Sequence, residues 1–397
     1  MKNNMLSKRI NACGICGSLN LESIWELPKL SLTEMFGTYD PNFPAFDQSL
    51  IICQYCGHVQ LGNQLDPNFL YQPDQYAFRT LPTFKIQKEL EFLTEFILKS
   101  IKSFDNQRVL EIGSSNLQFA KQLRHKVKSY AVCDPLLVEL DGQSIDEITI
   151  YGKFAEELSV KDLNFSLIFG RHVLEHMENP FAFLSKILTQ ANDNTIFVFE
   201  VPSLTHIRSG YRFDAIFHQH CHYFDLSSIN ILVEMLGCSL VDYTYNQAGS
   251  NGGSLIFAFK KSKEIFHNER FHYGKSLRQK VSELKKEIDL FNFQMNLTSQ
   301  YLNSYKGVTV GYGAAHMLAT LNYHLSNSIE GLDFILDDNS SMDGFQYKNI
   351  KVTVRSTENF DWNSVDAVFI TSMENRRFMT AKIIQNYDVR VICSNIL

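Results

Sequence analysis

Short apolar runs alternate with amphipathic segments along most of this 397-residue chain. Between residues 81 and 262, several runs have the length of a buried strand, and helical patterns separate them. These runs lie at residues 108–112, 129–132, 167–170 and 195–200, with two more at residues 240–243 and 254–260. The alternation predicts a parallel sheet with helices on both faces, and the last two runs predict an antiparallel pair that closes it.

Residues 261–305 are charged and carry one apolar stripe, formed by Leu277, Val281, Leu284, Ile288 and Phe291. Spacings of three and four predict one long linking helix that packs on its neighbours. A second alternating pattern follows and predicts a C-terminal, Rossmann-like α/β domain. Its expected strands are residues 308–311, 332–336, 367–370 and 390–392, and its expected helix is residues 314–324.

The first 80 residues show few periodic apolar runs and carry prolines at positions 28, 41, 44, 67 and 73. We expect an irregular, small domain that depends on a bound metal ion. The chain is therefore expected to be an α/β protein with three parts: residues 1–80, 81–262 and 263–397.

Composition favours an ordinary enzyme and excludes two other classes. Apolar residues make up 45% and charged residues 20%, which allows sizeable cores. The formal net charge of −6 argues against a nucleic-acid partner, since such proteins normally present a basic surface. No run approaches the roughly 20 apolar residues of a membrane span, so no membrane partner is expected. The polar N-terminus indicates no signal peptide, and we expect a cytoplasmic monomer.

Four of the eight cysteines form two matched pairs, Cys13 with Cys16 and Cys53 with Cys56, and glycine follows each pair. The glycine permits a tight knuckle in which backbone amides point at the sulfurs. Two knuckles present four thiolates tetrahedrally, as in structural Zn²⁺ sites, and leave no open position for chemistry. Two disulfides are the alternative, which a reducing cytoplasm disfavours.

The strand expected at residues 108–112 ends in Glu111 and a turn of small residues that includes Gly113 and Ser114. Such a turn lets a ligand approach the backbone, and the next helix offers free amides. Asp134 ends the second strand, where a carboxylate is positioned to bind ribose hydroxyls. Because no G-x-G-x-x-G is present, an ordinary dinucleotide fold is disfavoured.

The constellation resembles the class I S-adenosylmethionine methyltransferases. The resemblance implies that Glu111 and the glycine turn lie beside the methionine part of the cofactor and that Asp134 takes the ribose. The stretch from His172 to His176 resembles the exit of that fold's fourth strand, near the reacting methyl group. A turn required in a different α/β enzyme is the alternative.

The densest chemical segment holds His218, His220 and His222, with Tyr223 next. A cluster of imidazoles is typical of a site rather than of packing. Strand-like alternation predicts all three histidines on one side and Gln219 on the other. A zinc site formed by these histidines is a rival, but no fourth ligand is evident.

The chain as a whole resembles the sugar-nucleotide C-methyltransferases of deoxysugar biosynthesis, which methylate C3 of a 4-keto sugar carried on a nucleoside diphosphate. That family has a four-cysteine zinc domain, a central methyltransferase domain and a C-terminal α/β domain. The motifs that carry the resemblance are residues 53–61, 76–80, 109–115, 172–176, 200–202, 217–223, 251–255 and 311–314.

The resemblance implies roles for individual residues. His220 matches the family's general base, which removes the proton next to the ketone so that the resulting enolate attacks the cofactor methyl group. Tyr76 and His176 correspond to positions near the sugar. The zinc ion is structural, and the C-terminal domain covers the cleft and helps to hold the nucleotide sugar.

Two departures from the family bear on the reaction. The family's glutamate is Gln219 here, and its tyrosine is Phe217. A neutral amide does not raise the basicity of a neighbouring imidazole as a carboxylate does. His218, His222 or Tyr223 are the residues placed to compensate. O-methylation of a sugar nucleotide and a catalytically inactive scaffold that retains the fold remain the alternatives.

Overall fold

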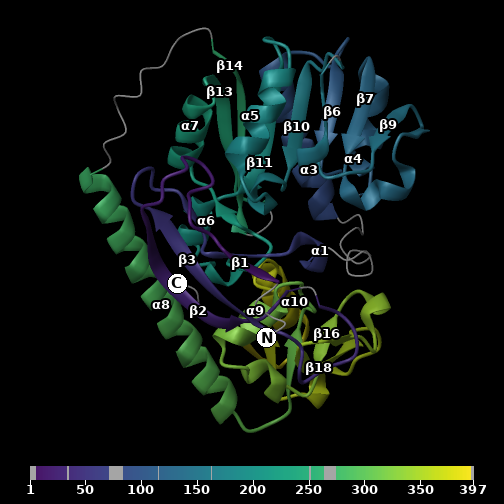
Figure 1. The fold of residues 1–397 in the computed structure, drawn as a ribbon. Coiled ribbons are helices and arrows are strands. Elements are labelled where there is room, and N and C mark those ends of the chain that lie inside the picture. Colours follow the sequence, from purple (N-terminus) through teal and green to yellow (C-terminus); the bar gives the residue numbers. More distant parts are fainter. Residues whose placement is uncertain are drawn as a thin grey trace.

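The structure, a computed structural model, describes residues 6–33, 35–70, 84–114, 116–161, 163–249, 252–262 and 274–394. Within these ranges the strands form four sheets, and one long helix runs beside the N-terminal strands toward the C-terminal sheet (Figure 1). No helix among the described residues is both long and apolar enough to cross a membrane.

The central sheet has eight strands in the order β13-β14-β11-β10-β6-β7-β9-β8. They are β6 (Arg108–Ile112), β7 (Ser129–Cys133), β8 (Ser144–Ile145), β9 (Ile148–Tyr151), β10 (Leu167–Arg171), β11 (Ile196–Pro202), β13 (Cys238–Asn246) and β14 (Ser254–Lys261). The five strands from β9 to β11 run parallel, and β14 lies antiparallel between β11 and β13. The predicted strands and the closing antiparallel pair are confirmed.

Helices cover both faces of this sheet, as predicted. α3 (Phe84–Ile101) and α4 (Gln118–Leu123) bury Leu93 and Phe119 on one face. α5 (Pro180–Gln190) and α7 (Leu226–Met235) bury Phe183 and Leu232 on the other. The order of strands reverses between β6 and β10, which is where ligands bind in open α/β sheets.

The N-terminal residues are not irregular, and that prediction was wrong. β2 (Leu21–Leu30), β3 (Phe46–Cys53) and β4 (Val59–Leu61) form an antiparallel sheet, while β1 (Ser7–Arg9) pairs with β5 (Asn63–Leu65) ahead of α1 (Pro67–Leu70). Register shifts along β2 bury Ile24, Leu27 and Leu30 at intervals of three instead of two. The bulges therefore hide this strand from a period-two pattern.

A short strand from the central part of the chain completes the N-terminal sheet. β12 (His222–Tyr223) pairs with β4, so that His222 faces Gln60 and Tyr223 faces Val59 in the register. The predicted histidine segment is thus attached to the N-terminal part of the chain. The domain boundary at residue 80 stays a prediction, although strands from before and after this residue form the N-terminal sheet.

α8 (Gly274–Ser304) is the predicted linking helix, and α6 (Leu204–Ser209) lies beside it (Figure 1). Leu277, Leu284, Ile288 and Phe291 of the predicted stripe are buried. They share one core with β2, β3 and the C-terminal sheet. The helix therefore packs on its neighbours, as predicted.

The C-terminal sheet has the order β17-β18-β16-β15-β19-β20, and all its strands except β17 run parallel. Its elements are β15 (Thr309–Tyr312), α9 (Leu318–His324), β16 (Ile335–Asp337), β17 (Gln346–Tyr347), β18 (Ile350–Ser356), β19 (Ala367–Ile370), α10 (Arg376–Asn386) and β20 (Arg390–Cys393). The predicted Rossmann-like domain is present. β17, β18 and α10 were not predicted; α10 leaves Phe378 and Ile384 exposed, so its amphipathic pattern is weak.

The glycine turn after β15 is held by the chain's own acid. Gly313 has φ of +106°, and the Ala314 amide donates to Asp337 Oδ2 at 2.7 Å. The Asn339 amide donates to the other oxygen of Asp337 at 2.9 Å. One carboxylate oxygen thus holds the glycine turn and the other holds the loop after β16, which favours a structural reason for this motif.

Candidate functional site

The turn after β6 requires a glycine. Gly113 has φ of +78°, and a Cβ atom there would lie 2.4 Å from Val173 Cγ2. Its amide donates to the Cys133 carbonyl at 2.9 Å, which joins the turn to the end of β7. A larger residue would therefore disturb two adjacent strand ends.

Glu111 is buried in β6 beside this turn. Burial raises the pKa of Glu111 to about 7, and the hydrogen bond from Tyr130 opposes that shift. The Tyr130 hydroxyl donates to Glu111 Oε2 at 2.7 Å. At neutral pH this carboxyl group is therefore able to respond to a charged ligand by losing its proton.

Asp134 follows β7 and is buried. Its Oδ1 accepts a hydrogen bond of 2.8 Å from the Leu136 amide, which fixes the carboxylate at the start of a short 3₁₀ helix. Ser114 is also buried, in the turn after β6. Because β6 and β7 are parallel neighbours, Glu111, Gly113, Ser114 and Asp134 lie at one edge of the sheet.

β10, which pairs with β6, ends at the same edge and is followed by a residue with a strained backbone. His172 has φ of +52°, which is uncommon for a residue with a side chain. Its amide donates to the Glu200 carbonyl of β11 at 2.9 Å. Its Nδ1 lies 3.2 Å from Glu175 Oε1. The ring nitrogen is the donor, because a carboxylate oxygen accepts hydrogen bonds. Such strain is often found at functional sites.

A buried ionic network supports this edge. Arg171 Nε donates to Glu200 Oε2 at 2.9 Å, and Arg171 Nη2 forms an ion pair with Glu89 of α3. Ser254 of β14 donates to Glu200 Oε1 at 2.6 Å. Since every member is paired, the network holds the ends of β10, β11 and β14 together.

The predicted acceptor segment forms a turn where alternation was expected. The His220 amide donates to the Phe217 carbonyl at 3.1 Å. His218 Nε2 donates to the Leu30 carbonyl at 3.0 Å, and Gln48 Nε2 lies 3.3 Å from His218 Nδ1. The prediction that the three histidines share one side was wrong, because a turn breaks the two-residue period. His218 is part of the N-terminal core.

His222 points in yet another direction. Its Nε2 lies 3.4 Å from the Glu178 carbonyl, and its Nδ1 lies 3.0 Å from His58 Nε2. A Cβ atom on Gly14 would lie 2.4 Å from its ring, so it packs directly on the first cysteine knuckle. Burial lowers the pKa of His222 to about 4. These contacts indicate that His222 has a structural role.

Two of the predicted catalytic residues do come together. The rings of His176 and His220 are 4.8 Å apart between centroids, at an interplanar angle of 75°. His176 Nδ1 donates to the Gln219 carbonyl at 2.7 Å, which fixes its ring. His220 is buried with its ring 4.1 Å from that of Phe217. His176 ends the short 3₁₀ turn Leu174–His176 that follows β10, and the strained His172 lies between the strand and this turn.

The other predicted catalytic residues are placed elsewhere. The Tyr223 hydroxyl accepts a hydrogen bond of 3.1 Å from the Phe217 amide, and burial raises the pKa of Tyr223. Tyr223 therefore stabilises the turn that carries His220. Tyr76 lies outside the described residues.

Sequence reasoning missed Glu175, which is completely buried. It belongs to a single 3₁₀ turn, Leu174–His176, directly after β10. One ligand atom from each of Glu175, His176 and His220 lies within 4.8 Å of the others. The signal was present, because Glu175 stands inside the motif that contains His172 and His176.

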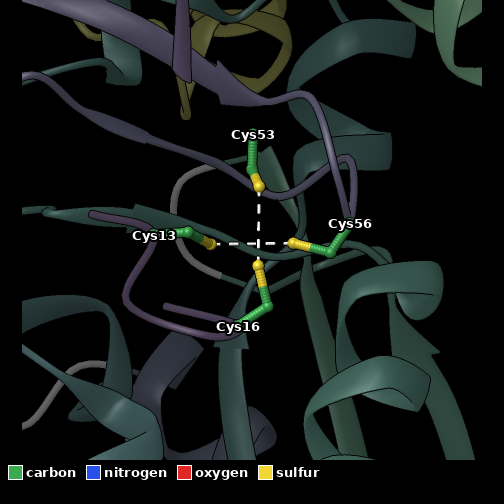
Figure 2. Close-up of side chains that lie close together, drawn as sticks. All are labelled: Cys13, Cys16, Cys53 and Cys56. Carbon is green, nitrogen blue, oxygen red and sulfur yellow. Dashed lines mark hydrogen bonds between the residues drawn. The ribbon is translucent and has the colours of Figure 1, made fainter. Parts of the chain in front are cut away.

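The four predicted cysteine ligands converge on one point (Figure 2). Cys13 Sγ lies 3.6 Å from Cys56 Sγ, and Cys16 Sγ lies 3.5 Å from Cys53 Sγ. Zn–S bonds of about 2.3 Å in a tetrahedron separate sulfurs by about 3.8 Å. All eight cysteines are free thiols, so the disulfide alternative was wrong. The geometry fits a metal ion bound by four thiolates.

Both knuckles are built alike. Gly17 and Gly57 have φ of +69° and +72°, and their amides donate to the carbonyls of Cys13 and Cys53 at 2.9 Å. The Tyr55 amide also donates to Cys53 Sγ at 3.4 Å. The predicted role of the glycines is confirmed.

Comparison with known proteins gives a family for the central part. Residues 85–243 match the methyltransferase domain family. The chain is 23% identical to C-methyltransferase NovU of Streptomyces niveus over 257 residues, 62% of this chain and 60% of that protein. The match therefore spans less than two thirds of the curated relative.

Solved structures of methyltransferases are similar to slightly less than half of the chain. N-methyltransferase NodS from Bradyrhizobium japonicum WM9 is 18% identical, with a TM-score of 0.35 over 45% of this chain and 97% of that one. Magnesium protoporphyrin IX methyltransferase from Synechocystis PCC 6803 is 13% identical, with a TM-score of 0.36 over 47% of this chain and 91% of that one.

The family match covers residues 85–243, and the parallel strands of the eight-stranded sheet lie in the same part of the chain. Residues 85–243 are a class I S-adenosylmethionine-dependent methyltransferase domain.

Proposed function

We propose that the protein transfers the methyl group of S-adenosylmethionine to carbon in a nucleotide-linked 4-keto sugar. The observation that supports this reaction is the contact between the half-buried His176 and the buried His220, beside the carboxyl end of β10. The similarity to a protein named C-methyltransferase supports transfer to carbon. The sugar and its nucleotide rest on the resemblance of the sequence motifs.

The reaction needs a base close to the cofactor methyl group. A proton next to a ketone is acidic enough for an imidazole to remove, and His220 is the proposed base. The electron pair stays on the sugar as an enolate, which then attacks the methyl carbon as the bond to sulfur breaks. General-base catalysis contributes about 10²- to 10⁴-fold, and alignment of the two reactants contributes much of the rest.

The cofactor belongs at the edge formed by the ends of β6, β7 and β10. Asp134 is proposed to take the ribose hydroxyls, and Glu111 with the turn at Gly113 and Ser114 to lie beside the methionine part. His172 would contact the cofactor near the sulfonium. The carboxylate at Asp134 is already oriented by the Leu136 amide, so little ordering is needed on binding.

Cys13, Cys16, Cys53 and Cys56 are proposed to hold one structural Zn²⁺. Four thiolates complete a tetrahedral shell and leave no position for substrate. Residues 263–397 are proposed to cover the cleft and to help hold the nucleotide sugar.

Transfer of label tests the reaction. Purified protein is incubated with methyl-labelled S-adenosylmethionine and a panel of nucleotide 4-keto sugars. We expect label on carbon, with loss of deuterium from C3 of a deuterated substrate. Label found only on oxygen, with deuterium retained at C3, would refute C-methylation.

O-methylation is the second candidate, and one contact favours it. Phe217 places an apolar ring 4.1 Å from His220, at a position where the resembled family has a phenol. An alcohol acceptor needs less stabilisation of a carbanion than a ketone does. Calorimetry separates both enzymes from an inactive scaffold, since a scaffold need not bind S-adenosylmethionine whereas an enzyme must.

A further inference from the structure

Glu175 is a buried carboxylate surrounded by imidazoles. It is completely inaccessible to solvent. Its Oε1 accepts a hydrogen bond of 3.2 Å from His172 Nδ1, and no hydrogen bond to Oε2 is found among the described residues. His176 and His220 each bring a ring nitrogen within 4.8 Å.

This arrangement favours a positive charge next to Glu175. A buried carboxylate is costly unless a cation or several hydrogen bonds compensate it. One imidazole donor, His172, reaches one of its two oxygens. A proton that moves to either neighbouring imidazole would produce the missing cation within a few ångströms of the carboxylate.

The residue expected from sequence motifs to influence His220 is turned away. Gln219 Oε1 accepts a hydrogen bond of 3.0 Å from Thr33 Oγ1 in the N-terminal part. The Gln219 carbonyl accepts from His176 Nδ1, so this residue orients the second histidine through its backbone. The side chain at position 219 therefore contributes no charge to the histidine pair.

We propose that Glu175 acts on the reaction through the His176–His220 pair: its carboxylate stabilises the imidazolium formed when His220 takes the acceptor's proton. This inference rests on the proposed function. The C–H bond of the sugar breaks, the proton binds a ring nitrogen of His220, and the electron pair attacks the methyl carbon. S-adenosylhomocysteine leaves as a neutral thioether, and the proton on His220 passes to water.

The titratable groups that face Glu175 come from three elements. His172 follows β10, His176 shares the 3₁₀ turn with Glu175, and His220 lies in the turn before β12. His222 of β12 is also within electrostatic reach: burial lowers its pKa, and Glu175 opposes that shift. A carboxylate favours the charged form of each imidazole, so its removal should move the acid limb of the pH–rate profile to lower pH.

The first test compares Glu175→Gln with Glu178→Gln, a matched control whose exposed side chain pairs with Lys8. Turnover is measured against pH with labelled S-adenosylmethionine and the nucleotide sugar that accepts label in the test above. Glu175→Gln should lower kcat by roughly 10²-fold, at the lower end of the general-base contribution, with KM nearly unchanged. Glu178→Gln should match the wild type. Equal kcat and an unshifted acid limb in both variants would overturn the proposal.

The second test needs neither a substrate nor a folded Glu175 variant. The wild-type protein is labelled with [¹³Cε1]-histidine, His220→Asn assigns the resonance, and the pH titration is followed by NMR. We expect His220 to titrate at a higher pH than His222, although the two side chains are similarly buried. A midpoint near 4, like that of the buried His222, would overturn the proposal.

The two tests separate this proposal from the proposed function. If no nucleotide sugar is methylated while His220 titrates as expected, the substrate is wrong and the role of Glu175 is supported. Metal analysis gives a further check. A second metal ion per chain that is lost in Glu175→Gln would overturn the proposal, because that ion and not an imidazolium would then neutralise the carboxylate.

Discussion

His58 Nε2 lies 3.0 Å from His222 Nδ1, across 164 positions of sequence. The two rings are stacked with their centroids 5.2 Å apart. His58 follows the second cysteine knuckle, and His222 lies on β12, the strand that follows the proposed base. The N-terminal cysteine cluster and the proposed acceptor segment therefore pack against each other. Substitution of a cysteine in the cluster should therefore also destabilise the methyltransferase domain.

Loss of the metal should destabilise more than the N-terminal residues. Cys53→Ser removes one of four thiolates, and we expect the variant to lose its zinc. Cys13, Cys53 and Cys56 share a core with Phe183 and Leu232 of the methyltransferase helices, so the main unfolding transition should shift to lower temperature. Metal analysis and calorimetry measure both effects.

Cys238→Ser is the matched control, because Cys238 is buried in β13 away from the cluster. It should keep one zinc ion per chain. Freshly purified wild-type protein without zinc, or a full equivalent of zinc in Cys53→Ser, would contradict the proposed site.

The two neighbouring histidines should respond differently to substitution. His220→Ala should lower turnover by roughly 10²- to 10⁴-fold and leave the affinity for S-adenosylmethionine near that of the wild type. His218→Ala should keep turnover per folded molecule but lose about 1–3 kcal/mol of stability, because the buried Leu30 carbonyl loses its donor. Steady-state kinetics and urea unfolding distinguish the two effects. The reverse pattern would move the base to His218.

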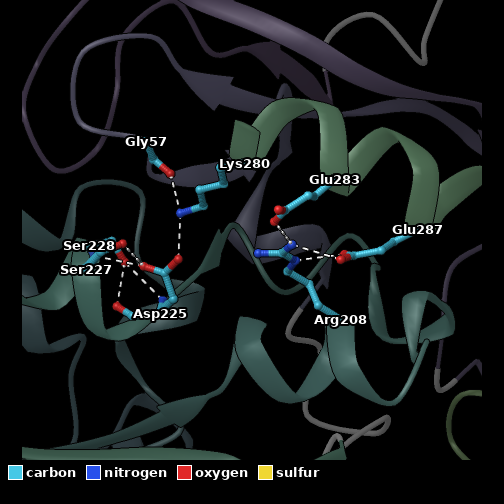
Figure 3. Close-up of polar contacts among 8 residues, drawn as sticks. All are labelled: Gly57, Arg208, Asp225, Ser227, Ser228, Lys280, Glu283 and Glu287. Carbon is cyan, nitrogen blue, oxygen red and sulfur yellow. Dashed lines mark hydrogen bonds and ion pairs between the residues drawn. The ribbon is translucent and has the colours of Figure 1, made fainter. Parts of the chain in front are cut away.

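An ion pair between α8 and the methyltransferase domain should matter for stability. Lys280 Nζ donates to the Gly57 carbonyl at 2.8 Å and to Asp225 Oδ2 at 2.5 Å, beside the ion pairs of Arg208 with Glu283 and Glu287 (Figure 3). Burial raises the pKa of Asp225, but Lys280 and the local hydrogen bonds outweigh it and lower the pKa to about 2.

Lys280→Met should therefore lower the free energy of unfolding by about 2–3 kcal/mol, since it leaves a largely enclosed carboxylate without its cation. Lys285→Met, one turn further along α8, removes an exposed pair with Glu22 and should cost less than about 1 kcal/mol. Urea denaturation at neutral pH measures both. If the two variants lost equal free energies of unfolding, the Lys280–Asp225 pair would matter no more than the exposed pair.

Acid should destabilise the protein through buried histidines. Burial lowers the pKa of His218, His222 and His324 to about 4, from an ordinary value of 6.5. The unfolded chain therefore binds protons first as the pH falls from 6.5 toward 4, and stability is lost over that range. At pH 5.5 each histidine should cost about 1 kcal/mol.

His324→Phe isolates one of these contributions. The ring of His324 stacks on Trp25 at 5.3 Å and meets Phe291 edge-on, contacts that a phenyl ring can keep. We expect near wild-type stability at pH 7 and a loss between pH 7 and 5.5 that is smaller by about 1 kcal/mol. An unchanged pH dependence would show that His324 does not titrate as its burial implies.

The sequence by itself determined the local features whose signals lie close together in the chain. The strands of the central sheet, the stripe on α8 and the cysteine knuckles follow from residue spacing, because period and turn chemistry act over a few residues. The cofactor edge was also predictable, since parallel strands place Gly113 and Asp134 at the same end. β2 was not, because its bulges replace alternation with intervals of three.

Only the tertiary structure decided which polar side chains meet. His218, His220 and His222 are separated by single residues, yet they contact Leu30, His176 and His58, respectively. Their directions depend on the turn at residues 217–220 and on the pairing of β12 with the N-terminal sheet. Burial, which lowers the pKa of His222 and encloses Glu175, is likewise a property of packing between segments far apart in sequence.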